Sequence, residues 1–310
     1  MMHEPPPEMT SIHVNPATID RKELAWQLEG GNILRFAPHA LPLPSDEDLH
    51  FLRDVLGNHI SLKNISYHPE GDYLTGLRAS GPIRQRTRDI LRQRHQQVQA
   101  LLQSTLPYAC RAGKVNFRPI QEQGRDLNVR ASNERIHVDA FASGATHGAR
   151  VLRLFTNIHP TEARVWKSAG KLSVLLREFA KPWGIPPERN FNPRWRDAAY
   201  SACLGLISRL GLHQAALIDS SPYDRCMRRI HNLLKQDEVF QDQRERWSTL
   251  SFAPFETWAV MTDMVSHGVI SGRHALVNTY YIPLHQCIQP QVAPYYLLQS
   301  DRAPQQPLVS

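Results

Sequence analysis

Hydrophobic and polar positions in the first third of the chain alternate mostly at helical spacing. A short apolar run over 32–36 predicts a strand, and 45–56 predicts a helix with Ser45 as its N-cap and acidic residues in its first turn. A longer helix follows and ends at Pro107. Its apolar positions recur every three or four residues: Ile90, Leu91, Val98, Leu101, Leu102 and Leu106. Residues 1–20 are proline-rich with little periodicity, which predicts a flexible arm.

From Lys114 onward the pattern changes to short apolar runs bounded by Gly, Pro or Asn, which predict strands. These strands are expected at 115–120, 135–141, 149–158, 257–270 and 274–284, the last two separated by the turn Ser271-Gly272. Three helices are expected between them, at 173–180, 196–211 and 223–234. The order of helices, strands, helical insert and strands indicates an α+β, mainly β fold with helices packed on a barrel or sandwich.

This pattern predicts one domain over 21–310. Its sheet core is expected at about 114–166 and 250–290, with a helical insertion at about 170–245. The chain has 310 residues, of which 41% are hydrophobic and 21% charged, which is typical of a globular protein.

Targeting signals and cysteine motifs are absent from the sequence. The longest apolar stretch, 198–211, is interrupted by Ser201, Ser208 and Arg209 and is too short to cross a bilayer. The first residues resemble no secretory signal, so we expect a cytoplasmic protein. The four cysteines form no CxxC pair, which predicts buried, reduced side chains rather than a zinc site or disulfides.

Positive charge is concentrated in one segment. Between Arg78 and Arg135 the chain carries twelve Arg or Lys residues against four Asp or Glu residues, more than the net +7 of the whole chain. This is either a solvated helix face or a surface for an anionic partner: nucleic acid, an anionic membrane or a phosphorylated substrate. No zinc-finger spacing, RNA-binding aromatic motif or basic-region heptad supports nucleic acid.

The sharpest chemical motif is His137-Val138-Asp139. Residues i and i+2 of a strand point to the same face, so the two side chains can converge on one ion. A distant third histidine would complete the two-histidine, one-carboxylate set typical of non-haem Fe(II). His267, His274 and His285 are candidates; we favour His267, which follows a predicted strand and precedes the tight turn. This spacing is the layout of a double-stranded β-helix.

An iron centre of this kind uses a metal-chelating co-substrate whose distal carboxylate needs a cation. Arg273, just past the turn after His267, is the first candidate. Arg164 is the second and Arg153 the third.

Several ordered runs resemble the Kdo hydroxylase family. They are KNISYHPEG (63–71), VNFRPIQEQGRD (115–126), RIHVDAFAS (135–143), THGARVLRLFTNIHP (146–160), ARVW (163–166), SPYDRCMRRIHNLLKQD (221–237) and TWAVMTDMVSHGVISG (257–272). The resemblance implies a cupin-like jelly roll, Fe(II), 2-oxoglutarate and O2, with His137, Asp139 and His267 as metal ligands. It also implies hydroxylation at C3 of 3-deoxy-D-manno-oct-2-ulosonic acid (Kdo) in Kdo-lipid A, giving D-glycero-D-talo-oct-2-ulosonic acid (Ko) in the lipopolysaccharide inner core.

The implied substrate is anionic, because Kdo carries a carboxylate and lipid A carries phosphates. Arg118, Arg125 and Arg130, nearest to the HxD motif, are therefore the expected substrate cations, and the long basic helix is expected to meet the anionic inner-membrane leaflet. We expect a peripheral protein at the cytoplasmic face of that membrane, with no nucleic-acid partner. The alternatives are a 2-oxoglutarate oxygenase acting on another sugar, lipid or amino acid, and a non-catalytic basic module that binds nucleic acid or membrane.

Overall fold

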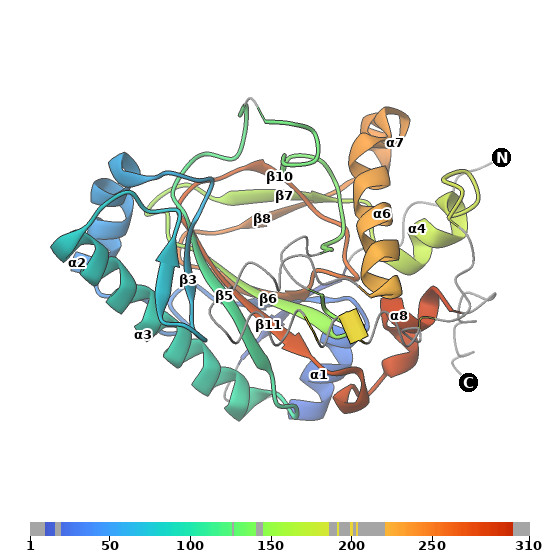
Figure 1. Ribbon diagram of the computed structural model, residues 1–310, viewed down its shortest axis with the longest axis horizontal. Helices are drawn as coiled ribbons and strands as arrows, with labels where there is room; N and C mark the ends of the chain where they lie inside the picture. Colours follow the sequence, from blue (N-terminus) through green and yellow to red (C-terminus); the bar gives the residue numbers. More distant parts are fainter. Residues whose placement is uncertain are drawn as a thin grey trace.

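Two β-sheets lie at the centre of the computed structural model (Figure 1). The structure describes residues 10–15, 20–125, 127–140, 145–185, 191, 199–200, 203 and 221–299. The large sheet has the order β1-β2-β9-β6-β11-β5-β3-β4, and all its neighbouring strands are antiparallel except the parallel pair β1 and β2. The small sheet has the antiparallel order β10-β7-β8.

The strands of the large sheet are β1 (Ser11–Val14), β2 (Ile33–Phe36), β3 (Ile65–His68), β4 (Tyr73–Thr75), β5 (Arg111–Arg118), β6 (Arg150–Asn157), β9 (Thr257–Met261) and β11 (Ala275–Ile282). Those of the small sheet are β7 (Arg164–Ser168), β8 (Ser248–Phe252) and β10 (Gly268–Ser271). Successive strands therefore pass back and forth between the sheets: β6 is followed by β7 and β8 in the small sheet, β9 in the large, β10 in the small and β11 in the large.

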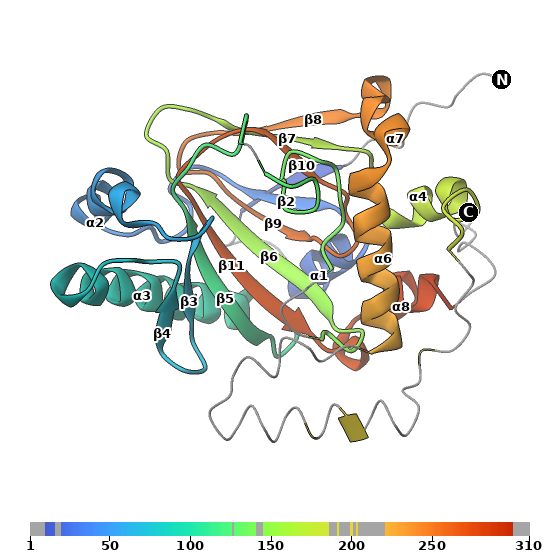
Figure 2. The ribbon, with the colours of Figure 1, turned by 45° about the horizontal axis from the view of Figure 1, so that its top comes forward.

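Helices cover the ends and one side of the sheets. They are α1 (Arg21–Glu29), α2 (Asp46–His50), α3 (Gly81–Thr105), α4 (Leu172–Phe179), α6 (Pro222–Gln236), α7 (Glu238–Asp242) and α8 (Pro294–Leu297). The long helix α3 packs against β3, β4 and β5. Figures 1 and 2 place α6 at one end of the sheets and α2 at the other. None of the helices in the described part of the chain is both long and apolar enough to cross a bilayer.

A cluster of aromatic side chains holds the two sheets together. Phe155 and Trp258 come from the large sheet, and Trp166 and Phe252 from the small one; all are at most 1% exposed. Phe252 stacks on Trp258 with ring centroids 3.8 Å apart, and Trp166 meets Phe155 edge to face at 4.7 Å. Such packing buries a large apolar area at the sheet interface. Trp166 also stacks on His267 at 5.1 Å, so this core supports a residue of the HxD-based site.

The predicted helix over 45–56 begins as expected but ends early. Ser45 caps it by accepting a hydrogen bond from the Asp48 amide at 3.2 Å. The α-helix ends at His50, and the chain goes on as a π turn and then a 3-10 turn to His59. Gly57 and Asn58, which are poor helix formers, lie in that last turn. The long helix ends at Thr105, just before Pro107, as predicted.

The predicted flexible arm is wrong for residues 11–14. These residues form β1, in which Ile12 pairs with Leu34 of β2, and Val14 is buried. The strand forms because β2 offers an edge whose backbone groups need partners. The large sheet also includes β1 to β4, which lie outside the predicted core ranges, and β8 begins at Ser248.

Two further predicted strands are corrected. The segment 135–140 is no strand beyond a single bridge at His137, because the next backbone bond of this segment, from the Asp139 amide, goes to the Thr262 carbonyl in the turn at 2.7 Å rather than to β10. The Gln241 side chain binds the N–H and C=O of Ile136 on the outer edge, at 3.0 and 2.9 Å. The predicted strand over 257–270 is divided between the two sheets as β9 and β10, with a turn at 262–266 that carries the chain across. Residue 141 and most of the predicted helix over 196–211 lie outside the described residues.

The four cysteines are free, as predicted. Cys226 is buried and Cys110 and Cys287 are half-buried. Cys203 is exposed, so the expectation of burial is wrong for that residue.

The arginines of α3 mostly contact groups of the protein itself. Arg84 donates to the Leu74 carbonyl at 2.9 Å, Arg86 pairs with Asp48 at 3.0 Å, and Arg92 pairs with Asp72 at 2.5 Å. Arg94 is 1% exposed and donates to Pro42 O, Thr156 Oγ1 and Asn278 Oδ1. Burial lowers the pKa of Arg94 to about 10, so it stays charged at neutral pH. Much of the predicted basic segment is therefore structural.

Arg94→Ala tests this structural role. The variant leaves three acceptors without their donor and opens a cavity, so we expect a loss of about 2–4 kcal/mol in the free energy of unfolding. Urea unfolding measures it, with the exposed Arg78→Ala as control, for which we expect a change below about 0.5 kcal/mol. Equal unfolding midpoints for Arg94→Ala and the unmodified chain would contradict the assignment.

Candidate metal centre

His137, Asp139 and His267 meet in one buried cluster. A ligand atom from each lies within 4.8 Å of those of the other two. His137 Nε2 is 3.9 Å from Asp139 Oδ1, and the two imidazole centroids are 4.6 Å apart. The three residues are 5–8% exposed. Of the three histidines considered as third ligand, His267 is the one that joins the HxD pair.

Backbone hydrogen bonds bring these residues together. The amide of His137 donates to the His267 carbonyl at 3.0 Å, and the amide of His267 donates back at 2.8 Å. The Asp139 amide donates to the Thr262 carbonyl at 2.7 Å. The HxD segment is thereby tied to the turn between β9 and β10. Side chains of an antiparallel bridged pair lie on the same face, so the two imidazoles are adjacent.

The same geometry sets which nitrogen of each histidine is free. His137 Nδ1 lies 2.7 Å from the Arg135 carbonyl, and His267 Nδ1 lies 3.0 Å from the Val265 carbonyl. A carbonyl only accepts, so Nδ1 carries the hydrogen and Nε2 presents its lone pair to the cluster. Burial lowers the pKa of both histidines, which keeps the imidazoles neutral and able to coordinate.

Asp139 supplies the negative charge. Burial alone would raise the pKa of its carboxyl, but the guanidinium of Arg153, 3.1 Å from Oδ2, and the nearby His267 outweigh burial and hold this pKa at about 2. The carboxylate is therefore ionised at neutral pH. Two neutral imidazoles and one carboxylate are the donor set that suits mononuclear non-haem Fe(II) with open positions. The residues present fit this metal.

A cavity of about 190 Å³ adjoins the cluster. Besides the three cluster residues, its lining comprises Arg118, Arg130, Ala131, Asn133, Arg153, Phe155, Trp166, His231, Lys235 and Val269. Four of these carry positive charge at neutral pH and come from β5, β6, α6 and the segment before the HxD motif. A space with this lining favours ligands that bear more than one carboxylate or other anionic group.

The structure divides the six predicted arginines into two groups. Arg118, Arg130 and Arg153 line the cavity. Arg125, Arg164 and Arg273 are not among its lining residues. Arg273 is exposed and its Nε donates to His159 Nε2 at 3.1 Å. Arg164 is fully buried and donates to the Gly272 carbonyl at 3.1 Å.

Glu122 links several of these cations from behind the cavity wall. It is 3% exposed and lies 3.4 Å from Arg118, 3.6 Å from Arg164, and 3.9 Å from both Arg125 and Lys63. Asn133 also donates to it, at 3.0 Å. Burial would raise the pKa of Glu122, but Arg118, Arg164 and Lys63 outweigh it and lower this pKa. Sequence reasoning missed Glu122, although Arg118 and Arg125 lie within four residues of it and could have pointed to an ion pair; its other partners, Arg164 and Lys63, are distant along the chain.

Two further cavity residues come from α6. His231 meets His137 edge to face at 5.0 Å, and its Nδ1 bonds to the Val138 carbonyl at 2.7 Å. Lys235 donates to the Arg130 carbonyl at 3.0 Å. Sequence reasoning placed neither in the site, although their i, i+4 spacing on a predicted helix puts them on one face.

A buried two-histidine, one-carboxylate cluster beside a cationic cavity, in a two-sheet fold, defines the class of mononuclear non-haem iron oxygenases. The family model for 3-deoxy-D-manno-oct-2-ulosonic acid (Kdo) hydroxylases matches residues 12–302, so the chain belongs to the Kdo hydroxylase family. The family predicted from the ordered sequence runs is confirmed.

Solved structures of the Kdo hydroxylase KdoO, a non-heme Fe(II) α-ketoglutarate-dependent dioxygenase, are similar over nearly the full length. The apo form and the complex with α-ketoglutarate and Fe(III) each share 25% sequence identity and a TM-score of 0.77, covering 94% of this chain and 95% of theirs. The complex with succinate and Fe(III) gives 25% identity and a TM-score of 0.76, covering 93% and 94%. No curated protein matches the chain.

Removal of one cluster histidine tests the metal site. His267→Ala deletes one of three donors, so we expect Fe(II) or Co(II) affinity to fall by more than about 100-fold while the unfolding midpoint of the apoprotein changes little. Anaerobic titration calorimetry measures it. His285→Ala, an exposed histidine considered for the same role, is the control and should bind like the unmodified chain. If His267→Ala still bound one metal ion as tightly as the unmodified chain, His267 would not be a ligand of this site.

Proposed function

We propose that the chain hydroxylates C3 of Kdo in Kdo-lipid A, giving Ko, in a reaction that requires Fe(II), 2-oxoglutarate and O2. The observation that carries this proposal is the His137, Asp139 and His267 cluster at the wall of a cavity lined by four cations. Family membership and the similarity to KdoO over nearly the full length support the same activity.

We also infer that the two sheets are the halves of a double-stranded β-helix. Eight successive segments support this: β5, the bridged segment at His137, and β6 to β11. They switch between the sheets at every step except from β7 to β8, which both lie in the small sheet, in the order expected of a jelly roll, with the His137 segment beside β10 at the edge of the small sheet. The metal donors then lie at the open end between the sheets.

His137 Nε2, His267 Nε2 and an oxygen of Asp139 would hold the metal. Bound Fe(II), with 2-oxoglutarate as electron donor, supplies the activation of O2 that hydroxylation of a C–H bond requires. The chain's own contribution is to orient both organic ligands and to exclude water. Phe155, Trp166 and Val269 form the apolar part of the cavity wall that does so.

We assign the distal carboxylate of 2-oxoglutarate to Arg118 and Arg153 rather than to Arg273 or Arg164. Both guanidiniums line the cavity. Arg153 also lowers the pKa of the nearby Asp139 carboxyl. Burial, the largest influence, lowers the pKa of Arg118, and the nearby Arg153 lowers it further. A dianionic ligand between the two would offset this repulsion. Arg164 acts from behind, through Glu122.

The Kdo carboxylate is assigned to Arg130 and Lys235, which lie on the α6 side of the cavity, with His231 beside them. Arg125, the remaining predicted substrate cation, contacts Glu122 and serves to orient it.

We further propose that the protein works at the cytoplasmic face of the inner membrane, in peripheral contact with its anionic leaflet. The net charge of +7 and the lipid nature of the substrate support this.

The direct test supplies Fe(II), 2-oxoglutarate, air and Kdo-lipid A to the full chain and uses mass spectrometry. We expect the lipid to gain one oxygen atom, with one succinate formed for each oxygen inserted, and no gain when iron, 2-oxoglutarate or His137 is removed. Succinate without oxygenated lipid would point to another substrate. If neither succinate nor oxygenated lipid formed, the proposal would be overturned.

Arg118→Gln tests the 2-oxoglutarate assignment. Loss of one charge-assisted contact to a carboxylate should raise the KM for 2-oxoglutarate by about 10–100-fold and the KM for Kdo-lipid A much less. Steady-state kinetics with each substrate varied in turn measures the split. Arg273→Gln is the matched control and should leave both KM values unchanged. If the KM for 2-oxoglutarate rose only in Arg273→Gln, Arg273 rather than Arg118 would bind the distal carboxylate.

The Kdo assignment predicts a pH dependence. Burial lowers the pKa of Lys235 to about 8, partly opposed by Asp139 and Glu122 and reinforced by Arg118. Since only the ammonium form attracts a carboxylate, the KM for Kdo-lipid A should rise as pH increases through about 8. Lys235→Arg stays protonated and should flatten this rise. An equal rise in both proteins would show that another group is responsible.

A further inference from the structure

The cavity beside the metal cluster is rich in hydrogen-bond donors and poor in acceptors. Four of its lining side chains are the cations Arg118, Arg130, Arg153 and Lys235. Guanidinium and ammonium groups, like the Trp166 indole, have hydrogens to donate and no lone pair with which to accept. Among the described side chains that line the cavity outside the metal cluster, only Asn133 and His231 can accept a hydrogen bond.

The amide of Asn133 has a defined orientation. Its Nδ2 donates to Glu122 Oε2 at 3.0 Å. Although burial would raise the pKa of Glu122, the surrounding cations lower it, so this carboxylate is ionised and only accepts. Nδ2 rather than Oδ1 must therefore face Glu122. Oδ1 has no hydrogen-bond partner within the described part of the chain, so the amide offers a free acceptor at the cavity wall.

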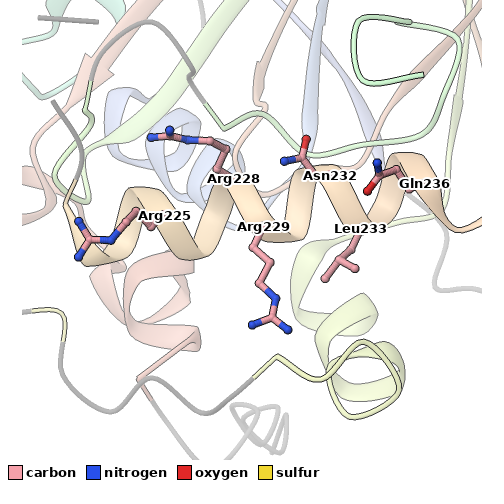
Figure 3. Close-up of a pocket in the computed structure, with 6 residues that line it drawn as sticks. All are labelled: Arg225, Arg228, Arg229, Asn232, Leu233 and Gln236. Atoms are coloured by element: carbon pink, nitrogen blue, oxygen red, sulfur yellow. The ribbon is translucent and has the colours of Figure 1, made fainter. Parts of the chain in front are cut away.

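Neighbouring contacts fix the backbone that carries Asn133. Its carbonyl accepts from the Val269 amide of β10 at 2.8 Å. The Arg130 carbonyl accepts from Lys235 of α6 at 3.0 Å, and Arg130 Nε donates to the Gln236 amide oxygen at 3.1 Å when that amide is oriented to accept. Figure 3 shows Gln236 near the C-terminal end of α6. The segment is thus attached to both β10 and α6, and Asn133 lines the cavity from a fixed backbone.

The chemistry of the two organic ligands decides which of them an acceptor serves. Ionised 2-oxoglutarate has two carboxylates and a ketone, which accept hydrogen bonds and do not donate them, so Oδ1 gains nothing from it. A sugar acid also has hydroxyls, and each of these can donate. Arg130, to which the sugar carboxylate is assigned, lies three residues before Asn133 in the same anchored segment. His231, the other acceptor, meets His137 edge to face at 5.0 Å and so lies beside the metal cluster.

We propose that Asn133 Oδ1 accepts a hydrogen bond from a hydroxyl of the sugar acid and is a specificity-determining residue of this cavity. This rests on the proposed function, which makes the ligand a sugar acid with several hydroxyls. The cations attract any carboxylate, whereas an oriented acceptor also requires a hydroxyl at one position, because a ligand without it leaves the acceptor unpaired. Asn133 thereby distinguishes the sugar acid from other carboxylates.

The test measures binding without catalysis. The full-length protein with Fe(II) and 2-oxoglutarate is titrated in the absence of O2 with Kdo-lipid A in uncharged detergent micelles, and with analogues that each lack one hydroxyl of the Kdo unit. We expect the unmodified chain to bind one analogue about three- to tenfold more weakly than the parent lipid. Asn133→Ala should bind the parent lipid more weakly by the same factor, and should bind that analogue and the parent equally, since the hydrogen bond is already lost.

Two further variants serve as controls. Asn58→Ala removes an exposed asparagine that does not line the cavity, and should behave like the unmodified chain with every lipid. Asn133→Ser keeps a hydroxyl that can donate to Glu122 but removes the amide oxygen. It should repeat the result of Asn133→Ala, and it replaces that variant if the alanine substitution impairs folding.

A second measurement separates this role from a structural one. Asn133 donates to Glu122, which lies 3.4 Å from Arg118, a cation assigned to 2-oxoglutarate. If Asn133 acted only by holding Glu122, Asn133→Ala would lose affinity for 2-oxoglutarate as well. We expect its affinity for 2-oxoglutarate, titrated in the absence of lipid, to equal that of the unmodified chain.

Three results would overturn the proposal. They are equal binding of the parent lipid by Asn133→Ala and the unmodified chain, the same penalty for every analogue in both proteins, and an equal loss of 2-oxoglutarate and lipid affinity in the variant. Failure of the proposed function is distinguishable. If the unmodified chain did not bind Kdo-lipid A, the proposed substrate and this assignment would both be overturned. If it bound the lipid but formed no hydroxylated product in air, only the proposed function would be overturned, and the difference made by Asn133 would remain.

Discussion

The pair of backbone hydrogen bonds between His137 and His267 is the constraint on which the site depends. It joins segments from opposite ends of the sheet core and places two imidazoles side by side, and the bond from Asp139 to Thr262 adds the carboxylate. The bridge is held in turn by neighbouring packing. Trp166 stacks on His267, and the buried Arg150–Asp263 ion pair, at 2.7 Å, anchors the turn that precedes it. Metal-ligand geometry is therefore built into the backbone rather than left to flexible side chains.

Electrostatics then determine what the cavity accepts. Asp139 and Glu122 are buried carboxylates surrounded by cations, so the site as a whole keeps an excess of positive charge. That excess disfavours the folded chain unless anions compensate it, and the proposed ligands bring carboxylates and phosphates. Other cations of the same basic segment, such as Arg94 and Arg86, are already satisfied within the fold. Net charge alone therefore overstates the binding surface.

The sequence predicted the donor set and most strands, because ligand spacing and apolar runs are local patterns. It failed where partners are distant. The expected strand around His137 is cut short because Asp139 bonds to Thr262 in the distant turn, and β1 forms only because β2 offers it an edge. Of the predicted co-substrate cations, Arg273 is next to His267 along the chain but pairs with His159, whereas Arg153 lines the cavity together with Arg118, both on strands that pair with β11. Proximity along the sequence is a poor guide across a two-sheet core.

The central claim is that the bridged pair and Asp139 form one iron site facing the cationic cavity. Anomalous diffraction at the iron edge, from crystals of the full chain loaded anaerobically with Fe(II), tests this most directly. The account predicts one peak among His137 Nε2, His267 Nε2 and the Asp139 carboxylate. A peak elsewhere, or coordination through Nδ1 of either histidine, would contradict it.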